Sequence, residues 1–242
     1  MAEKWLTKAE QRVLGALPER VFSLGEAHEV LDGDKRYLSE VLSRLAAKGR
    51  LLRLKRGLFK IPSADAELEA GLGFGGAGSY LGFASALSLH NMIDERLSAV
   101  FVASRSRRLR RIVRGTEYRV VPLDRACVGA VELRRLRVSS RAKTVFDCLL
   151  KPALCGGLGV LAGVLRENEF SREEWRGLLN YAQEFGSDAL KQRLGFAAER
   201  YAKPPEFFLR ELERDVGKTV AFWNPRQRRG VYDARWRVVA RV

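Results

Sequence analysis

Hydrophobic residues recur with helical spacing just after residue 33. Leu38, Val41, Leu42 and Leu45 follow the i, i+3, i+4, i+7 pattern, which gives one apolar face of an amphipathic helix. Asp34 precedes this face as an expected N-cap, and Gly49 follows it as an expected C-terminal glycine. The pattern therefore predicts a helix between these two residues.

Two short apolar runs follow this helix, and two further helices precede it. The runs Leu51–Leu54 and Leu58–Ile61 flank Lys55-Arg56-Gly57, which is typical of a hairpin turn. Segments 7–17 and 23–31 each begin with a Ser or Thr three residues before a Glu, the spacing of a capping box. Three helices and a hairpin predict a winged helix-turn-helix domain over residues 1–63.

The polar face of the third helix and the hairpin carry cations and hydroxyls. In a winged helix the third helix enters the major groove and the hairpin touches phosphates. A three-helix module that docks another protein is the alternative interpretation. The expected DNA-binding residues are Lys35, Arg36, Tyr37, Ser39, Arg44, Arg53, Lys55 and Arg56.

Residues 64–79 change from acidic to glycine-rich. Gly71, Gly73 and Gly76 match a GxGxxG pattern, but the preceding ADAELEA is not typical of a strand, which a dinucleotide fingerprint needs. We expect a flexible linker between two domains here.

Residues 80–242 predict a second domain that mixes strands and helices. A helix capped by Ser79 is expected to run to about Asn91, and the continuous apolar run 99–103 predicts a buried strand. Further strands are expected near 118–122 and 131–138, followed by helices and a closing hairpin. The fold class is therefore α+β, with an N-terminal winged helix-turn-helix and a C-terminal domain of a small sheet and a helical bundle.

Charge adds a candidate partner. The 242 residues carry a formal net charge of +15, which attracts a polyanion such as double-stranded DNA. Residues 104–143 hold 13 basic residues against three acids, so we expect a second basic surface there. Three interpretations of this surface are open: it extends the DNA-binding surface from the hairpin, it faces an acidic or RNA-bound partner, or it is a solvated loop. Its core is Arg105, Arg107, Arg108, Arg110, Arg111 and Arg114.

Catalytic and metal-binding patterns are missing. His28 and His90 have no ligand neighbours at metal spacing, and we expect no catalytic residues, no cofactor and no metal. Lys143 and Asp147 are expected to form a surface ion pair. Three cysteines without a CxxC pattern predict reduced thiols, and hence a cytoplasmic protein. No apolar run is long enough to predict a membrane span.

Several segments together resemble a known family. They are the hairpin LLRLKRGLFKIP, the segment YLGFASALSLHNMIDE from Tyr80 to Glu95, the strand AVFVAS, and SRAKTVFDCLLKPALCGGL from Ser140 to Leu158. Their order resembles that of the AbiEi-type antitoxins, transcriptional regulators paired with AbiEii-type nucleotidyltransferase toxins. The resemblance covers residues 7–201.

The resemblance implies two activities. The N-terminal domain would bind inverted repeats upstream of its own toxin–antitoxin operon and repress it. The C-terminal domain would neutralise the toxin, for which direct contact is not required. A stand-alone winged-helix regulator, with a C-terminal domain that senses a ligand or partner, is the alternative, and an enzyme acting on nucleic acid is the third interpretation.

Overall fold

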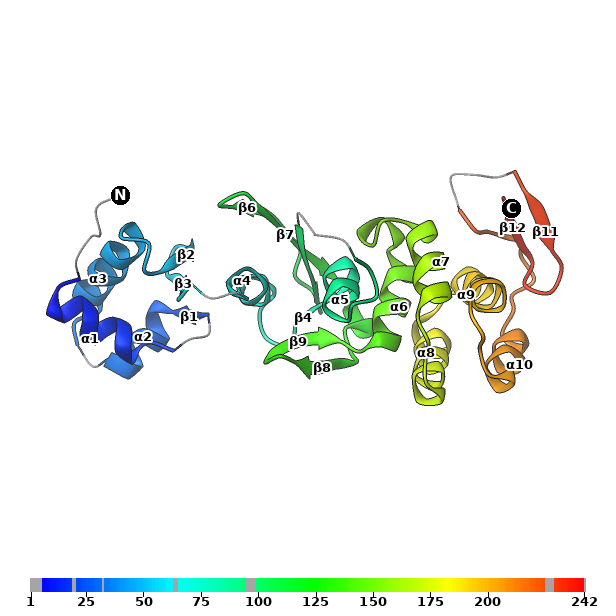
Figure 1. Cartoon of the computed structure of the whole chain (residues 1–242), viewed down its shortest axis with the longest axis horizontal. Helices are drawn as coiled ribbons and strands as arrows, with labels where there is room; N and C mark the ends of the chain where they lie inside the picture. Colours follow the sequence, from blue (N-terminus) through cyan, green and yellow to red (C-terminus); the bar gives the residue numbers. More distant parts are fainter. Residues whose placement is uncertain are drawn as a thin grey trace.

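The chain is an α+β protein in the computed structural model. The model describes residues 6–18, 21–31, 33–62, 65–94, 99–224 and 229–241. Within these ranges it contains ten α-helices and three sheets, which confirms the expected class. Residues 6–62, which we call the head, lie at one end of the molecule, and the C-terminal strands lie at the other (Figure 1).

Local capping explains the three helices of the head. They are α1 (Lys8–Ala16), α2 (Leu24–Leu31) and α3 (Lys35–Ala47). Thr7 and Glu10 cap each other reciprocally at the start of α1, and the Asp34 carboxylate accepts hydrogen bonds from two amides at the start of α3. The predicted helices and caps are therefore confirmed.

A small antiparallel sheet completes the head. Its strands are β1 (Phe22–Ser23), β2 (Leu52–Lys55) and β3 (Leu58–Lys60), in the order β1-β3-β2. Gly57, with φ of +73°, makes the turn between β2 and β3, as expected. Phe22 and Phe59 stack inside the head with the apolar face of α3.

The predicted linker is wrong over most of its length. Residues 66–75 form helix α4 (Ala66–Gly75), which packs on the large sheet. A Cβ atom on Gly71 would lie 2.7 Å from Val100 Cγ1, and one on Gly75 would lie 2.7 Å from Val102 Cγ1. These glycines therefore permit close contact between helix and sheet, and their abundance does not signal flexibility.

The large sheet has six strands in the order β6-β7-β5-β4-β9-β8. The pairs β5–β7 and β4–β9 are parallel, and the other neighbours are antiparallel. The expected strand at 131–138 is two strands joined by a turn. The strands are β4 (Tyr80–Leu81), β5 (Ala99–Ser104), β6 (Leu109–Val113), β7 (Thr116–Pro122), β8 (Ala130–Leu133) and β9 (Leu136–Ser139).

The expected helix from Ser79 to Asn91 is shorter than predicted. The Ser79 hydroxyl donates to the carbonyls of Leu72 and Gly76 and so closes the end of α4. Strand β4 follows, and helix α5 (Phe83–Leu89) begins only after Gly82. A hydroxyl residue before an apolar run therefore marked a helix end here, where the sequence predicted a start.

Helices follow the sheet and form a second core with it (Figure 1). They are α6 (Arg141–Leu150), α7 (Leu158–Glu167), α8 (Arg172–Phe185), α9 (Asp188–Tyr201) and α10 (Glu206–Arg214), with short 3-10 turns η1 (Asp124–Ala126) and η2 (Pro152–Leu154). The chain closes with β10 (Ala221–Phe222), β11 (Val231–Asp233) and β12 (Val238–Ala240). The antiparallel pair β11–β12 confirms the expected C-terminal hairpin. Among the described residues, no helix is long and apolar enough to cross a membrane.

The head is fixed to the rest of the chain through α4. Leu54 from β2 shares a buried cluster with Ala70 and Phe74 of α4 and with residues of the large sheet. Lys60 in β3 is buried, and its ammonium lies 2.5 Å from the Glu69 carboxylate of α4. Because a buried ammonium requires a partner, this ion pair ties the hairpin to α4.

We predict that Glu69→Gln lowers the free energy of unfolding by about 2 kcal/mol, because it leaves the buried Lys60 ammonium without its counter-charge. Denaturation in urea measures the change. Glu40→Gln, an exposed change on helix α3, is the control and should have an effect within about 0.5 kcal/mol. The double variant Lys60→Met/Glu69→Leu should recover most of the loss. Equal effects of the two single changes would contradict a structural role for the pair.

Candidate nucleic-acid interface

The first turn of α3 presents the predicted contact residues to solvent. Lys35, Arg36 and Tyr37 are all exposed, with 51% of Tyr37 accessible. The opposite side of the helix is buried in the head's core through Leu38, Val41, Leu42 and Leu45. A cationic helix start therefore faces outward because the apolar stripe faces inward.

Arg44, also exposed, is partly compensated by Glu10, for which the sequence predicted only a capping role. Its Nε atom lies 3.7 Å from Glu10 Oε1, and Lys48 Nζ donates to Glu10 Oε2 at 2.6 Å. The Lys48 ammonium and the Thr7 amide lower the pKa of Glu10 to about 2. Ser39 is half-buried. The cationic charge of α3 is therefore least compensated at its start.

The hairpin between β2 and β3 exposes two of its three predicted cations. Arg53 and Arg56 are exposed, whereas Lys55 is half-buried. The Gly57 carbonyl accepts a hydrogen bond from the Leu24 amide, which ties the turn to the start of α2. Leu54 points the other way, toward α4.

Further exposed cations of the head were not predicted, and Arg12 is one of them, with Lys8 and Arg50. Arg12 on α1 lines a hollow of 210 Å³ together with Tyr37, Val13 and Leu38. The capping box predicts that α1 begins after Thr7, and the apolar Val13 marks the inward side of this helix. Arg12 is turned about 100° away from Val13 around the helix axis, so the sequence already indicated that Arg12 faces outward. Arg12 thus extends the cationic surface from α3 onto α1.

The second basic surface is divided over two faces of a hairpin. Strands β6 and β7 place Arg110 opposite Arg119 and Arg111 opposite Tyr118. Neighbouring residues on a strand point to opposite faces, so Arg110 and Arg111 are separated by the sheet. The guanidinium of Arg111 lies over the Phe74 ring of α4, 5.9 Å from its centroid.

The remaining arginines of this surface lie at the ends of strand β6. Arg105, Arg107 and Arg108 are exposed before it, and Arg114, with φ of +52°, makes the turn into β7 with Gly115. Strand alternation therefore distributes these side chains over both faces of the sheet, and the role of the second basic surface stays a prediction.

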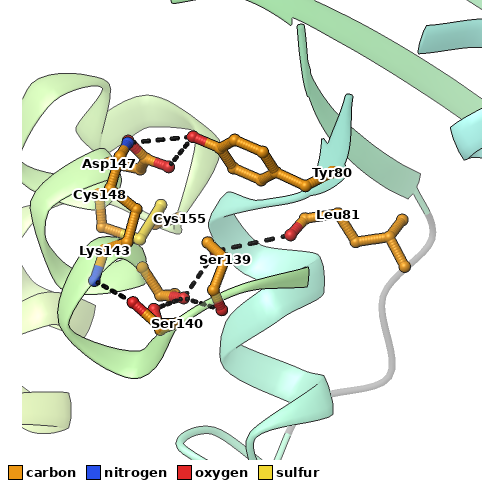
Figure 2. Close-up of a disulfide and its surroundings, with 9 residues drawn as sticks. Tyr80, Leu81, Ser139, Ser140, Lys143, Asp147, Cys148 and Cys155 are labelled. Carbon is orange, nitrogen blue, oxygen red and sulfur yellow. Dashed lines mark hydrogen bonds and ion pairs between the residues drawn. A yellow bond between two sulfur atoms is a disulfide. The ribbon is translucent and has the colours of Figure 1, made fainter. Parts of the chain in front are cut away.

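Lys143 and Asp147 are fully buried, so the predicted surface ion pair is wrong. Both side chains have zero exposure, and the Lys143 ammonium is paired with the Asp147 carboxylate. It also donates to the Tyr80 hydroxyl at 3.0 Å, and that hydroxyl donates to Asp147 at 3.0 Å (Figure 2). The triad joins β4 to α6.

Aromatic rings surround this triad. The Lys143 ammonium lies 5.1–5.7 Å from the ring centroids of Tyr80, Phe146 and Tyr181. Burial lowers the pKa of Lys143 and raises the pKa of Asp147. Since neither side chain reaches solvent, we interpret the triad as the polar centre of the core of the body, the name we give to the described residues from 65 to 241.

A second correction concerns the cysteines. Cys148, on α6, and Cys155 form a disulfide beside the triad (Figure 2). Cys127 is a free, half-buried thiol whose pKa is raised by burial. The prediction of reduced thiols is therefore wrong for this pair, and the cytoplasmic location that rested partly on it stays a prediction.

Both histidines are half-buried, and a backbone carbonyl holds His90. His90 Nε2 lies 2.7 Å from the Ser139 carbonyl and is half-buried at the end of α5, which agrees with a structural role. Burial lowers its pKa. Within the described ranges, no three His, Cys, Asp or Glu side chains gather as metal ligands.

Comparison with known proteins adds no relative. No protein-family model matches the sequence, and no curated protein matches it significantly.

We predict that Glu10→Gln destabilises the protein in a pH-dependent way. The folded-state pKa of Glu10, about 2, lies below the ordinary value of 4.5, so its stabilisation is complete above pH 4.5 and is lost as the pH falls toward 2. Urea denaturation at several pH values should show the variant's deficit shrinking below pH 4.5. The exposed Glu40→Gln serves as control. A deficit that stays constant with pH would contradict the assignment.

We predict that protein purified without reductant, then denatured and alkylated, carries one label, on Cys127. After reduction all three cysteines should be labelled. Peptide mass spectrometry identifies the positions. Three labels without reduction would contradict the disulfide.

Proposed function

We propose that this chain is a DNA-binding antitoxin of the AbiEi type that represses its own operon. The observation that carries the proposal is the exposed cationic start of α3, on a helix whose other face is buried in a three-helix head. In the proposed arrangement the head is a winged helix-turn-helix, with α3 as the recognition helix and the β2–β3 hairpin as the wing.

The roles of the head residues follow from their positions. Lys35, Arg36 and Tyr37 lie where a recognition helix contacts base edges and flanking phosphates. Arg53 and Arg56 lie on the wing, where cations meet phosphates and so position the protein without reading sequence. Asp34 is occupied with capping, so its charge is directed at the amides of α3.

The resemblance supplies the biological context of the proposal. An AbiEi-type protein binds inverted repeats in its operator, so two copies occupy one site. The body would then neutralise a nucleotidyltransferase toxin encoded beside it. Growth of cells that express the neighbouring gene, with and without this chain, tests this part: rescue supports it, and unchanged toxicity contradicts it.

A regulator without a toxin is the second candidate function. A groove of 560 Å³ between β6–β7 and the end of α6 favours it, since a sensing domain needs a concave site. Failure to rescue growth, together with DNA binding by the same protein, would favour this candidate.

We predict that Arg36→Ala and Arg56→Ala each weaken binding of the full chain to a duplex from its own upstream region. If each residue neutralises one phosphate, the slope of log Kd against log salt falls by about one unit in each variant. Fluorescence anisotropy measures both quantities. Arg214→Ala, an exposed arginine on α10 at the far end of the molecule, removes the same charge and should leave the slope unchanged.

Two outcomes would contradict the DNA interface. One is the same loss of affinity in all three variants, which would indicate general charge attraction. The other is an undiminished affinity and slope in both head variants, which would place the duplex elsewhere on the protein.

A further inference from the structure

The large sheet has a groove on the face turned away from α4. Tyr118 and Val120 of β7 pack beneath α4, so Arg119 and Val121, which alternate with them, point to the other face. There the end of α6 and the turn η2 form the opposite wall of a 560 Å³ groove, which we call the hairpin groove. Among the residues that the structure describes, neither the head nor the buried triad contributes to its lining.

The lining of the hairpin groove is cationic. Arg108, Arg110, Arg119 and Lys151 line it, and none of the described residues that line it is acidic. Glu117 lies next to the groove and pairs with both Arg110 and Arg119, which lowers the pKa of Glu117 to about 2. Arg108 and Lys151 are exposed at the groove, which therefore keeps a net positive charge.

The rest of the lining is aliphatic. Val121, Leu150 and Leu154 contribute its apolar surface, together with two prolines. No aromatic ring is among the described lining residues, whereas single-stranded nucleic acids are held largely by stacking on such rings. The Phe101 ring lies under the Arg119 guanidinium. The lining thus suits aliphatic side chains better than bases.

An exposed apolar residue continues the groove along the edge of the sheet. Ile112 of β6 is 68% exposed and stands opposite Glu117, on the same face as Arg110 and Arg119. Strand β6 is the outermost strand of the sheet, where a partner segment finds the sheet edge open. Cations and aliphatic side chains therefore occur together over one continuous face.

We propose that the hairpin groove binds an acidic segment of a protein partner. Aliphatic side chains of that segment would pack on Val121 and Leu154, and its carboxylates would pair with Arg108 and Lys151. Charge complementarity selects an acidic partner, and the aliphatic floor selects a peptide over a nucleic acid. The inference concerns the body alone and does not require the head to bind DNA.

The experiment titrates the full chain into a fluorescein-labelled peptide made of equal numbers of Glu and Leu, with anisotropy as the readout. The charge reversal Arg108→Glu/Lys151→Glu should weaken binding about tenfold or more. Arg125→Glu/Arg214→Glu makes the same change in net charge at exposed positions outside the groove, and should alter Kd less than about twofold. Thermal unfolding checks that both variants fold as the parent does.

Two further probes distinguish the occupants. A peptide with every Leu replaced by Ser keeps the charge and should bind about tenfold more weakly, because it cannot use the aliphatic floor. An oligothymidylate tests the nucleic-acid alternative. The proposal is overturned if both charge-reversal variants lose the same affinity for the Glu/Leu peptide, or if the Ser peptide binds as well as the Leu peptide. It is also overturned if only the oligothymidylate binds the parent protein and its affinity falls in the groove variant. It is likewise overturned if neither peptide binds the parent protein.

Discussion

The apolar stripe of α3 packs on the stacked Phe22 and Phe59 of the small sheet, and this contact fixes which side of the helix meets solvent. Burial of Leu42 and Leu45 stabilises the head by roughly 1.5–3 kcal/mol for each side chain, so a rotated helix would be costly. As a consequence, the cations at the start of α3 face solvent. The proposed DNA interface depends on this one orientation.

Helix α4 fixes the head relative to the body, because it packs against both the head and the large sheet. Its glycines let it approach β5 closely, and Glu69 holds Lys60 of the hairpin from the other side. The head is thereby placed by packing and one buried ion pair, where a flexible tether would leave its orientation free. For two copies on an inverted repeat, a fixed head would restrict how the bodies lie relative to the duplex. The same helix leaves the opposite face of β6 and β7 to the hairpin groove.

Sequence reasoning succeeded where the structure is determined by neighbours in the chain. The capping of α1 and α3 and the turn at Gly57 each depend on a few consecutive residues, and all were predicted. It failed where distant residues decide. Lys143 and Asp147 have the same spacing in a surface pair as in a buried one, and their burial depends on Tyr80, which lies more than sixty positions away. Gly71 and Gly75 of α4 likewise acquire their role from residues distant in the sequence, the valines of β5.

The proposed interface itself was only partly accessible from the sequence. The α3 residues were found because helical spacing separates the two faces, whereas Glu10, which compensates Arg44, lies on another helix. The β6–β7 hairpin was not predicted, because β6 carries arginines on both of its faces and so lacks the alternation of apolar and polar residues that is typical of a strand.

Adding duplex DNA to the isotopically labelled full chain and mapping amide chemical shifts tests the central claim most directly. We expect the largest changes at residues 35–37 and 53–56. Changes confined to the body, or none in dilute buffer, would contradict the account.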